Sequence, residues 1–411
     1  MQLQPIQYRP AVLAMLVMTL TFPALAQEQT VFSATKLLPG ASLVGSNYQV
    51  DDRVVNDGFL NHYTIYLEGK KYGVIGNSLM RVRLAELQAL QKMANVQRSD
   101  VYKKSFKNAA TGSLRGVKKL ITSPIETGKG IVSGVGTFFK GVGHSIFGGA
   151  SDQEDGVMKT AIGFDVAKRK FAYKFGIDPY TRFPPVRERL EEISWAGVAG
   201  NLTISAAFQG IPSPAKGAVS GTKAADGFSR LVRDSTPAEL KKTHSEKLKL
   251  MKVSDSVADL ILEHPKYSPT ERTVLIESLA MVGAYNREEF IKRAILVPDE
   301  DMAFFMRRWA QMYAAYHIHI TRVQRFVRLG KMPLAQREDG VLIGVLPSDH
   351  VGWTDAIAQR HATNMKDIGN IQGVTGGELW FEGTVSPKTR AALEAQRWVV
   401  KENVGPQLKL K

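Results

Sequence analysis

Residues 299–329, DEDMAFFMRRWAQMYAAYHIHITRVQRFVRL, carry the strongest periodic pattern in the chain. Apolar residues recur at spacings of three and four, and basic residues fall on the other faces. The apolar positions are Phe305, Trp309, Met312, Tyr316, Ile320, Val323 and Val327. Because this spacing places them on one side of a helix, the pattern predicts a long core helix over 299–329. An aromatic stripe can also line a ligand pocket, but core packing is its more usual role and is the role expected here.

The region around this stretch is predicted to be a helical domain over 157–330. Its helix starts are well marked: Ser268 is followed by Pro269 and Glu271, which combines an N-cap serine, a proline at the first position and a glutamate at the third. Residues 209–227 are rich in Gly, Pro, Ser and Ala, a composition typical of a loop or linker.

Residues 45–95 predict a small antiparallel β-meander closed by a helix. Its three β-branched and aromatic runs are 48–55, 59–67 and 71–75. The runs are separated by Asn56-Asp57-Gly58 and Glu68-Gly69-Lys70, which are hairpin turn sequences. Alternate residues of the second run share one mostly apolar face. The spacing then becomes helical over 78–94, and this helix is expected to cover that face.

The last part of the chain predicts a small α/β unit over 340–400. The expected strands are 341–346, 378–382 and 398–400, and the expected helices are 353–363 and 387–396, the second with Ser386 as its cap. The predicted fold class is therefore α+β and predominantly α-helical. It has a small N-terminal antiparallel β-meander plus helix, a central helical region and a small C-terminal α/β unit.

Composition excludes several classes of protein. The 411 residues contain no cysteine, which rules out a disulfide scaffold, a thiol nucleophile, cysteine-type zinc sites and a lipidated cysteine anchor. Lys and Arg number 54 against 39 Asp and Glu, a formal net charge of +15. An excess of this size favours an acidic partner surface.

The first 26 residues are typical of an export signal. Arg9 supplies the positive charge, residues 11–22 are largely apolar, and Ala24-Leu25-Ala26 has the small-x-small cleavage pattern. The apolar run is shorter than the roughly 20 residues that span a bilayer. The sequence thus predicts a signal peptide over 1–26 and an exported, periplasmic protein. Nucleic acid is then not the expected partner, and phospholipid headgroups, lipopolysaccharide and cell-wall polymers are the acidic surfaces that remain.

Residues 101–150 form a basic, Gly-rich and amphipathic segment. They contain eight Lys and Arg against the single acid Glu126, so their net charge is 8 − 1 = +7. A helix opened by Ser123-Pro124 would carry one apolar face but would contain six glycines. At roughly 0.5–1 kcal/mol each, the glycines oppose that helix by about 3–6 kcal/mol, so it requires a stabilising environment.

A membrane surface is the environment that the segment favours most. Lysines would contact anionic headgroups while apolar side chains insert. The predicted binding residues are Lys118, Lys119, Lys129, Val135, Phe138, Phe139, Lys140 and Val142. Packing against a partner helix or the protein's own core, where Gly130 and Gly134 permit close approach, and a flexible linker are the alternatives.

One compositional resemblance bears on this segment. The basic clusters followed by Thr122-Ser123-Pro124 and repeated Gly-Val-Gly are similar to the lipid-associated Gly-rich segments of bulk lipid-transfer proteins. The similarity is confined to this segment, and we assign no family from it.

Catalytic signatures are scarce. The chain has no Gly-x-Ser-x-Gly elbow, His-Glu-x-x-His zinc helix, phosphate-binding loop or dinucleotide fingerprint. The densest polar cluster lies between a predicted strand and helix, where Asp349, His350 and Asp355 are the candidate catalytic residues for general acid–base chemistry. Capping of the following helix by Asp349 or Thr354 is the structural alternative. His317 and His319 lie two apart within helical spacing, so they point apart rather than share a metal.

The sequence therefore favours a non-catalytic, envelope-associated protein that is peripheral on a membrane. Its basic Gly-rich segment is expected to contact an anionic lipid surface, a cell-wall polymer or a partner helix. An envelope hydrolase with the Asp/His site, and a purely structural or assembly protein, are the alternatives. We expect no cofactor and no metal.

Overall fold

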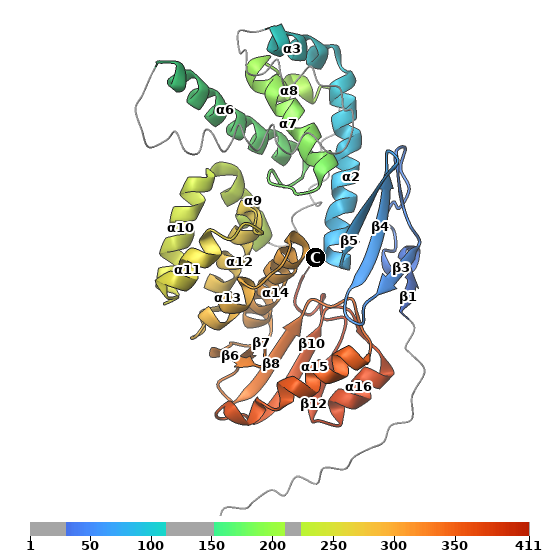
Figure 1. Cartoon of the computed structure of the whole chain (residues 1–411), viewed down its shortest axis with the longest axis vertical. Helices are drawn as coiled ribbons and strands as arrows, with labels where there is room; N and C mark the ends of the chain where they lie inside the picture. The colour runs from blue at the N-terminus through green and yellow to red at the C-terminus, as the bar shows by residue number, and fades with distance from the viewer. Residues whose placement is uncertain (1–29, 112–151, 210–222, 411) are drawn as a thin grey trace, which may run out of the picture.

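The computed structural model describes residues 30–111, 152–209 and 223–410. About 52% of the structure is helix and 18% strand, with an N-terminal antiparallel sheet, a central helical region and a C-terminal mixed sheet. The predicted fold class is thereby confirmed (Figure 1). The predicted signal peptide and most of the basic Gly-rich segment lie outside the described residues.

The N-terminal sheet is built around β4 (Asn61–Leu67). This strand pairs with β5 (Lys70–Ile75) on one edge and with both β2 (Tyr48–Val50) and β3 (Arg53–Asn56) on the other. All of these pairings are antiparallel, and β1 (Val31–Ser33), followed by the short helix α1 (Ala34–Leu37), extends the sheet beyond β3.

The predicted single strand over 48–55 is wrong in one respect, because the chain bends at Asp51 and Asp52. The Asp51 carboxylate accepts the Arg53 N–H at 3.0 Å, which is a local turn that competes with the strand ladder. Asp52 instead accepts the Ser33 hydroxyl at 2.8 Å and thereby ties β1 to this bend.

Helix α2 (Asn77–Arg98) covers the apolar face of this sheet, as predicted. Tyr63, Ile65 and Leu67 of β4 are buried against it, together with Leu84 and Leu87 of the helix. The turn before α2 is made by Gly76, whose φ of 92° is readily adopted only by glycine.

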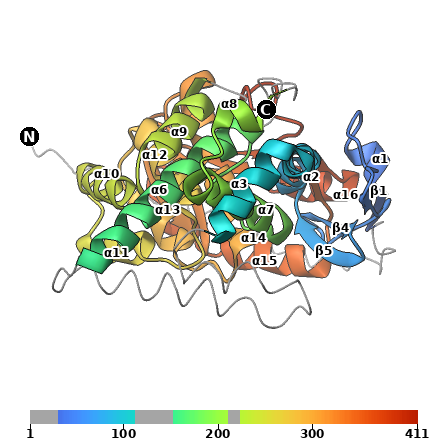
Figure 2. The same cartoon turned by 90° about the horizontal axis from the view of Figure 1, so that it is seen from above.

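A tier of helices continues from α2 at the end of the molecule farthest from the C-terminal sheet (Figure 1). It contains α3 (Asp100–Thr111), α6 (Asp152–Phe175), α7 (Pro184–Ala199) and α8 (Ile204–Ala207). Both α3 and α6 pack against α7, and the view from above shows the three helices side by side (Figure 2). Their buried side chains share one hydrophobic core with the N-terminal sheet.

The central helices form the middle of the molecule. They are α9 (Lys223–Asp234), α10 (Pro237–Leu250), α11 (Asp255–Leu262), α12 (Pro269–Val282), α13 (Glu288–Ala294) and α14 (Glu300–His319). Ser268 caps α12 as predicted: its hydroxyl accepts the Glu271 N–H, and Glu271 reaches back to the Ser268 N–H.

The predicted helix over 299–329 is correct only as far as His319. Ile320 ends α14, and the chain then enters a hairpin of β6 (Arg325–Leu329) and β7 (Met332–Gln336). Gly330, with a φ of 60°, makes the two-residue turn between them. The C-terminal sheet consequently begins at Arg325 and not near residue 340, and the last part of the predicted helical domain belongs to it.

The rest of the C-terminal unit follows the prediction closely. Strands β8 (Val341–Leu346), β10 (Gly376–Phe381) and β12 (Trp398–Lys401) are parallel, whereas β7 joins β8 antiparallel, giving the order β12-β10-β8-β7-β6. Helices α15 (Asp355–Met365) and α16 (Pro387–Glu394) make the crossovers and lie in front of the sheet in Figure 1. The 3-10 turn Ile368–Asn370 follows α15, and a second, two-stranded sheet pairs β9 (His350–Val351) with β11 (Thr384–Val385).

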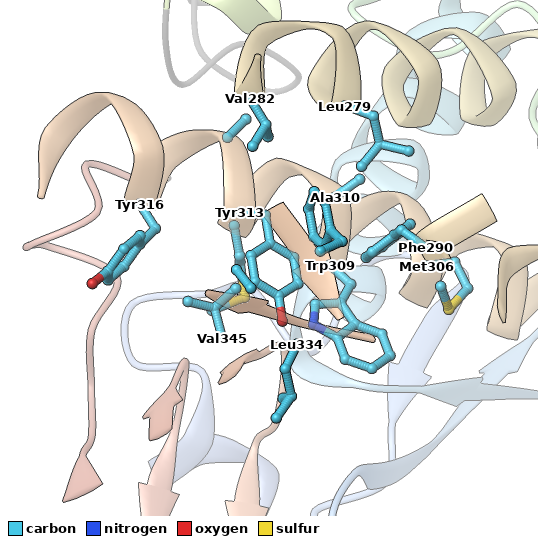
Figure 3. Close-up of a cluster of buried hydrophobic side chains, with 14 of the residues drawn as sticks. Leu279, Val282, Phe290, Met306, Trp309, Ala310, Tyr313, Tyr316, Leu334 and Val345 are labelled. Atoms are coloured by element: carbon cyan, nitrogen blue, oxygen red, sulfur yellow. The ribbon is translucent and has the colours of Figure 1, made fainter. Parts of the chain in front are cut away.

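The largest core lies where α12, α13 and α14 meet the C-terminal sheet (Figure 3). Phe290 contacts the rings of Trp309, Tyr313 and Phe326 at centroid distances of 5.7 to 5.9 Å. The Tyr313 hydroxyl donates to the Pro333 carbonyl at 2.7 Å, so its one buried polar group is paired. The predicted core role of the α14 stripe is confirmed for Trp309 and Tyr316.

Candidate functional site

The predicted Asp/His cluster lies at the junction between the N-terminal sheet and the C-terminal unit. Backbone hydrogen bonds join the two: the Asp349 N–H donates to the Phe59 carbonyl at 3.0 Å, and the Gly352 N–H donates to the Gly58 carbonyl at 3.1 Å. The loop after β8 is thereby fastened to the β3–β4 turn. Side chains from both parts then meet at the first turn of α2.

The Asp349 carboxylate spans this junction. It accepts the Asn61 N–H at 2.8 Å and the Asn77 N–H at 3.0 Å, so it bonds both β4 and the N-terminus of α2. The N-cap residue of α2 is Gly76, which has no side chain to satisfy the helix N–H groups. Asp349 therefore caps α2 from a part of the chain distant in sequence, whereas Thr354, the other cap candidate, caps the following helix α15.

Burial gives this carboxyl unusual acid–base properties. Desolvation raises the pKa of Asp349 to about 7, against the N–H donors of Asn61 and Asn77, which favour the charged form. Glu382 and Asp57 add to the rise through like-charge repulsion. A carboxyl that titrates near neutrality is able to exchange a proton at physiological pH.

His350 and Asp355 lie in different surroundings. The Nδ1 atom of His350 lies 2.8 Å from the Thr384 hydroxyl, and its ring meets Phe32 edge-on at 5.1 Å. Asp355 is exposed on the first turn of α15, whose cap is Thr354. Each of the three candidate residues thus has its own environment.

The hollow beside Asp349 is small. Its polar lining comes from Ser78, Asp301, Arg308 and Asp349, and the rest is mainly apolar. Its volume is about 20 Å³, which holds one water molecule but no substrate. Within the described residues its lining includes neither His350 nor Asp355.

An ion pair beside this hollow was not predicted. The Arg308 guanidinium of α14 donates from Nε to Glu382 at 3.1 Å, and the two side chains are only 13% and 19% exposed. The Ser78 hydroxyl of α2 also donates to Glu382, at 3.4 Å. Arg308 is one of the basic residues outside the apolar stripe of this helix, and the spacing alone does not show which residue it pairs with.

A second site lies at the opposite end of α2, where α3 and α6 pack against α7. Lys103, Lys104 and Lys107 are exposed on α3, and Lys170 and Lys174 are exposed on α6. The three lysines of α3 are called the basic end below, whereas Lys170 and Lys174 lie on the C-terminal half of α6, beside Tyr173, whose ring Arg233 of α9 covers. Lys103, Lys104 and Lys107 belong to the basic segment predicted over 101–150.

The helices of the basic end are held firmly in place. The α2 side chain Gln97 bonds Glu192 of α7 at 2.7 Å, and Lys168 of α6 pairs with Glu191 of α7 at 3.0 Å. A Cβ on Gly200, just beyond α7, would lie 2.0 Å from the Ser105 carbonyl oxygen of α3, so the chains touch there. The exposed lysines therefore project from a fixed surface.

The remaining predicted binding residues lie outside the described residues. They are Lys118, Lys119, Lys129, Val135, Phe138, Phe139, Lys140 and Val142. Helix α3 precedes this stretch and α6 follows it, and both helices pack against α7.

Two further features concern metal ligands and membrane spans. Across residues 30–111, 152–209 and 223–410, no group of three or more His, Asp or Glu side chains is arranged to hold a metal. His317 and His319 lie on the last turn of α14 as predicted, and His317 accepts the Val323 N–H at 3.0 Å. Over the same described ranges, none of the helices combines the length and apolar character needed to span a membrane.

No protein-family model, curated protein or solved structure matches this chain.

Proposed function

We propose that the protein is an exported, periplasmic and non-catalytic protein that binds an anionic phospholipid surface through its basic end. The observation that carries the proposal is the display of three exposed lysines, Lys103, Lys104 and Lys107, on α3, a helix that packs on α7. In the sequence, α3 directly precedes the stretch that contains the predicted apolar residues Val135, Phe138, Phe139 and Val142.

Charge supports an anionic partner. Residues 101–150 carry a net charge of 8 − 1 = +7, and three of these basic residues are the exposed lysines of α3. Each basic residue near an anionic bilayer contributes about 1 kcal/mol. Several together are sufficient for reversible binding that weakens as salt is added.

The hydrolase alternative has weaker support. Its central carboxylate accepts the N–H groups of Asn61 and Asn77, and the adjoining hollow is too small for a substrate. An acid–base role needs a substrate atom within hydrogen-bond reach of the carboxyl.

The test is sedimentation with vesicles of neutral lipid and of lipid containing phosphatidylglycerol, at low and at high salt. The mature protein is compared with Lys103→Gln/Lys104→Gln/Lys107→Gln and with a variant that lacks residues 113–148. The matched control is Lys331→Gln/Lys366→Gln/Lys401→Gln, which removes three exposed lysines from the C-terminal unit.

We expect the α3 variant to bind anionic vesicles roughly 100-fold more weakly, since about 1 kcal/mol is lost for each of the three lysines. The deletion should remove binding, and the control should change it little. Circular dichroism checks that each variant is folded. Equal binding to neutral and anionic vesicles, equal losses in the α3 and control variants, or binding only to a cell-wall polymer would each overturn the proposal.

A further inference from the structure

Strand β5 is an outer strand of the N-terminal sheet and pairs with β4 on one side only (Figure 1). A two-residue turn joins the two strands, with Leu67 of β4 opposite Lys70 of β5. The residues that flank such a turn bond to each other, and bonded pairs then recur at every second residue. Lys70, Tyr72 and Val74 therefore bond β4. The other edge of β4 agrees with this alternation, because the Thr64 carbonyl accepts a hydrogen bond from the chain that follows β2.

The remaining residues of β5, Lys71, Gly73 and Ile75, turn their backbone groups away from β4. Asp301 of α14 accepts a backbone hydrogen bond from Ile75, which closes this edge at its C-terminal end. Within the described residues, no hydrogen bond reaches the N–H or C=O of Lys71 or Gly73. Gly73 is exposed, and because it has no side chain, its exposed surface is backbone. The outer edge of β5 thus presents two successive pairs of unbonded donors and acceptors.

The chemistry of this edge indicates what it would pair with. An open strand edge is a template for another extended chain, and a glycine inside a strand often marks the close approach of another backbone. A Cβ on Gly73 would meet nothing within 4 Å, so space is available there. Lys70 and Lys71 are exposed, and neither forms an ion pair within the described part of the chain. In a chain with a net charge of +15, these lysines oppose pairing with a second copy and attract acidic side chains.

We propose that the outer edge of β5 binds an extended acidic segment of another protein as an added antiparallel strand. One residue of the partner exchanges both hydrogen bonds with Lys71, and the residue two positions earlier exchanges both with Gly73. Backbone bonds supply the affinity, and the side chains that face the two lysines supply the specificity. The proposal concerns a protein partner and is independent of the basic end.

The pairing defines a sequence pattern for the partner. Residues directly opposite each other share a face of the sheet, so acidic residues are expected opposite Lys71 and Lys70. An aromatic residue is expected opposite Gly73, where its ring covers the space left by the missing side chain. Burial raises the pKa of Tyr72, with the nearby carboxylate of Glu188 adding to the rise, so the residue opposite Tyr72 is expected to be uncharged. The expected pattern is aromatic-uncharged-acidic-acidic.

The first test measures binding of a dye-labelled peptide, acetyl-Thr-Tyr-Thr-Glu-Glu-Thr-amide, to the full mature protein by fluorescence anisotropy. One control peptide carries lysines in place of both glutamates, and a second is N-methylated at the tyrosine and at the first glutamate. Both controls should bind about tenfold more weakly, the first through like charge and the second through lost backbone donors. Equal binding of either control, or no binding of the acidic peptide up to about 1 mM, would overturn the proposal.

The second test changes the protein. Gly73→Pro removes the outward N–H and leaves the hydrogen bonds to β4 in place, so the acidic peptide should bind about tenfold more weakly. Gly73→Ala is the matched control, because it keeps the N–H and its Cβ meets nothing. Lys70→Gln/Lys71→Gln should weaken binding about threefold. Equal affinities of the proline and alanine variants would contradict strand addition at this edge.

Amide exchange in the natural protein keeps the proposal testable if Gly73→Pro folds poorly. Without peptide, the Lys71 and Gly73 amides should exchange fast, and the Tyr72 and Val74 amides, which bond β4, should exchange slowly. Saturation with the acidic peptide should slow exchange at Lys71 and Gly73 by about tenfold or more and leave the other two unchanged. Binding without this protection would refute the proposed site. Protection that instead grows with protein concentration in the absence of peptide would show that a second copy occupies the edge, which overturns the assignment of an acidic partner.

Discussion

The core beneath α14 is held together by apolar side chains, whereas the junction at Asp349 is held together by polar and charged groups. In the core, Phe290, Tyr313 and Phe326 meet edge to face with complete burial. At the junction, the two parts of the chain are joined by the Asp349 carboxylate, which accepts backbone N–H groups, and by the ion pair of Arg308 and Glu382. Apolar contacts are insensitive to pH, whereas the polar junction depends on the protonation of its parts. We therefore expect the core to set the stability of the molecule and the junction to set how that stability responds to conditions.

The largest loss of stability should come from removing a large side chain from the core. Phe290→Ala removes a ring that is 0% exposed and contacts three other aromatic rings, so it should lower the free energy of unfolding by about 3–5 kcal/mol. Urea unfolding followed by tryptophan fluorescence measures the loss.

The matched control for Phe290→Ala is Tyr285→Ala, five residues earlier. Tyr285 is 71% exposed, so its truncation should change stability by less than about 0.5 kcal/mol. A comparable loss in both variants would mean that the aromatic cluster is not the main core.

The helical region holds a buried titrating group whose pKa is shifted in the opposite direction to that of Asp349. His244 of α10 is 1% exposed, and burial lowers the pKa of its imidazole to about 4, with Arg272 and Lys247 adding to the effect. Because the unfolded chain takes up this proton first, the stability present above pH about 6.5 is lost as the pH falls towards 4, by up to about 3 kcal/mol.

His244→Leu should remove that loss. Unfolding at pH 7 and at pH 5 measures it: the natural protein should lose stability on acidification relative to the leucine variant. An unchanged difference between the two proteins at the two pH values would contradict the burial of a neutral imidazole.

A smaller loss of stability should follow when a methyl group is added where two chain segments touch at the junction. Gly383→Ala places a methyl group 1.9 Å from the Asp349 carbonyl oxygen, which forces the two segments apart at a cost of about 1–3 kcal/mol. Gly369→Ala is the control, because a Cβ there meets nothing within 4 Å. If the two substitutions cost the same, the junction is not closely packed.

The smallest effect concerns one helix cap within the central helices. Ser268→Ala removes the hydroxyl that accepts the Glu271 N–H, and should cost about 1 kcal/mol. Ser254 is also an N-cap but makes no side-chain capping bond, so Ser254→Ala should cost less. Thermal unfolding of the pair measures the contribution of the hydroxyl itself.

What the sequence predicted well is local. The strand Val341–Leu346 was predicted at its observed bounds, and Ser386 caps α16 by accepting the Thr389 N–H. Caps, turns and periodicity depend on residues a few positions apart, and these interactions survive into the folded chain. The hairpin turn at Glu68 and Gly69, both at positive φ, belongs to the same group.

The sequence predicted two kinds of feature poorly. One kind depends on residues far apart in the chain, and the other is a strand whose apolar residues happen to continue the spacing of the preceding helix. Ile320, Val323 and Val327 continue the helical spacing of α14, yet Val327 lies in β6 and pairs with Leu334 of β7. The alternation in RFVRL and the glycine at 330 would have indicated this hairpin. Asp349 and Asn77 are 272 positions apart, so no local pattern shows that one caps the other.

That separation has a consequence for the order in which the chain is made. The first turn of α2 is complete only when Asp349 accepts the Asn77 N–H, but Asp349 is synthesised 272 residues after its partner. During synthesis, the N-terminal sheet and α2 exist for most of the time without their cap. A late part of the chain thus completes one of the first helices. A product truncated before Asp349 would lack the cap on α2.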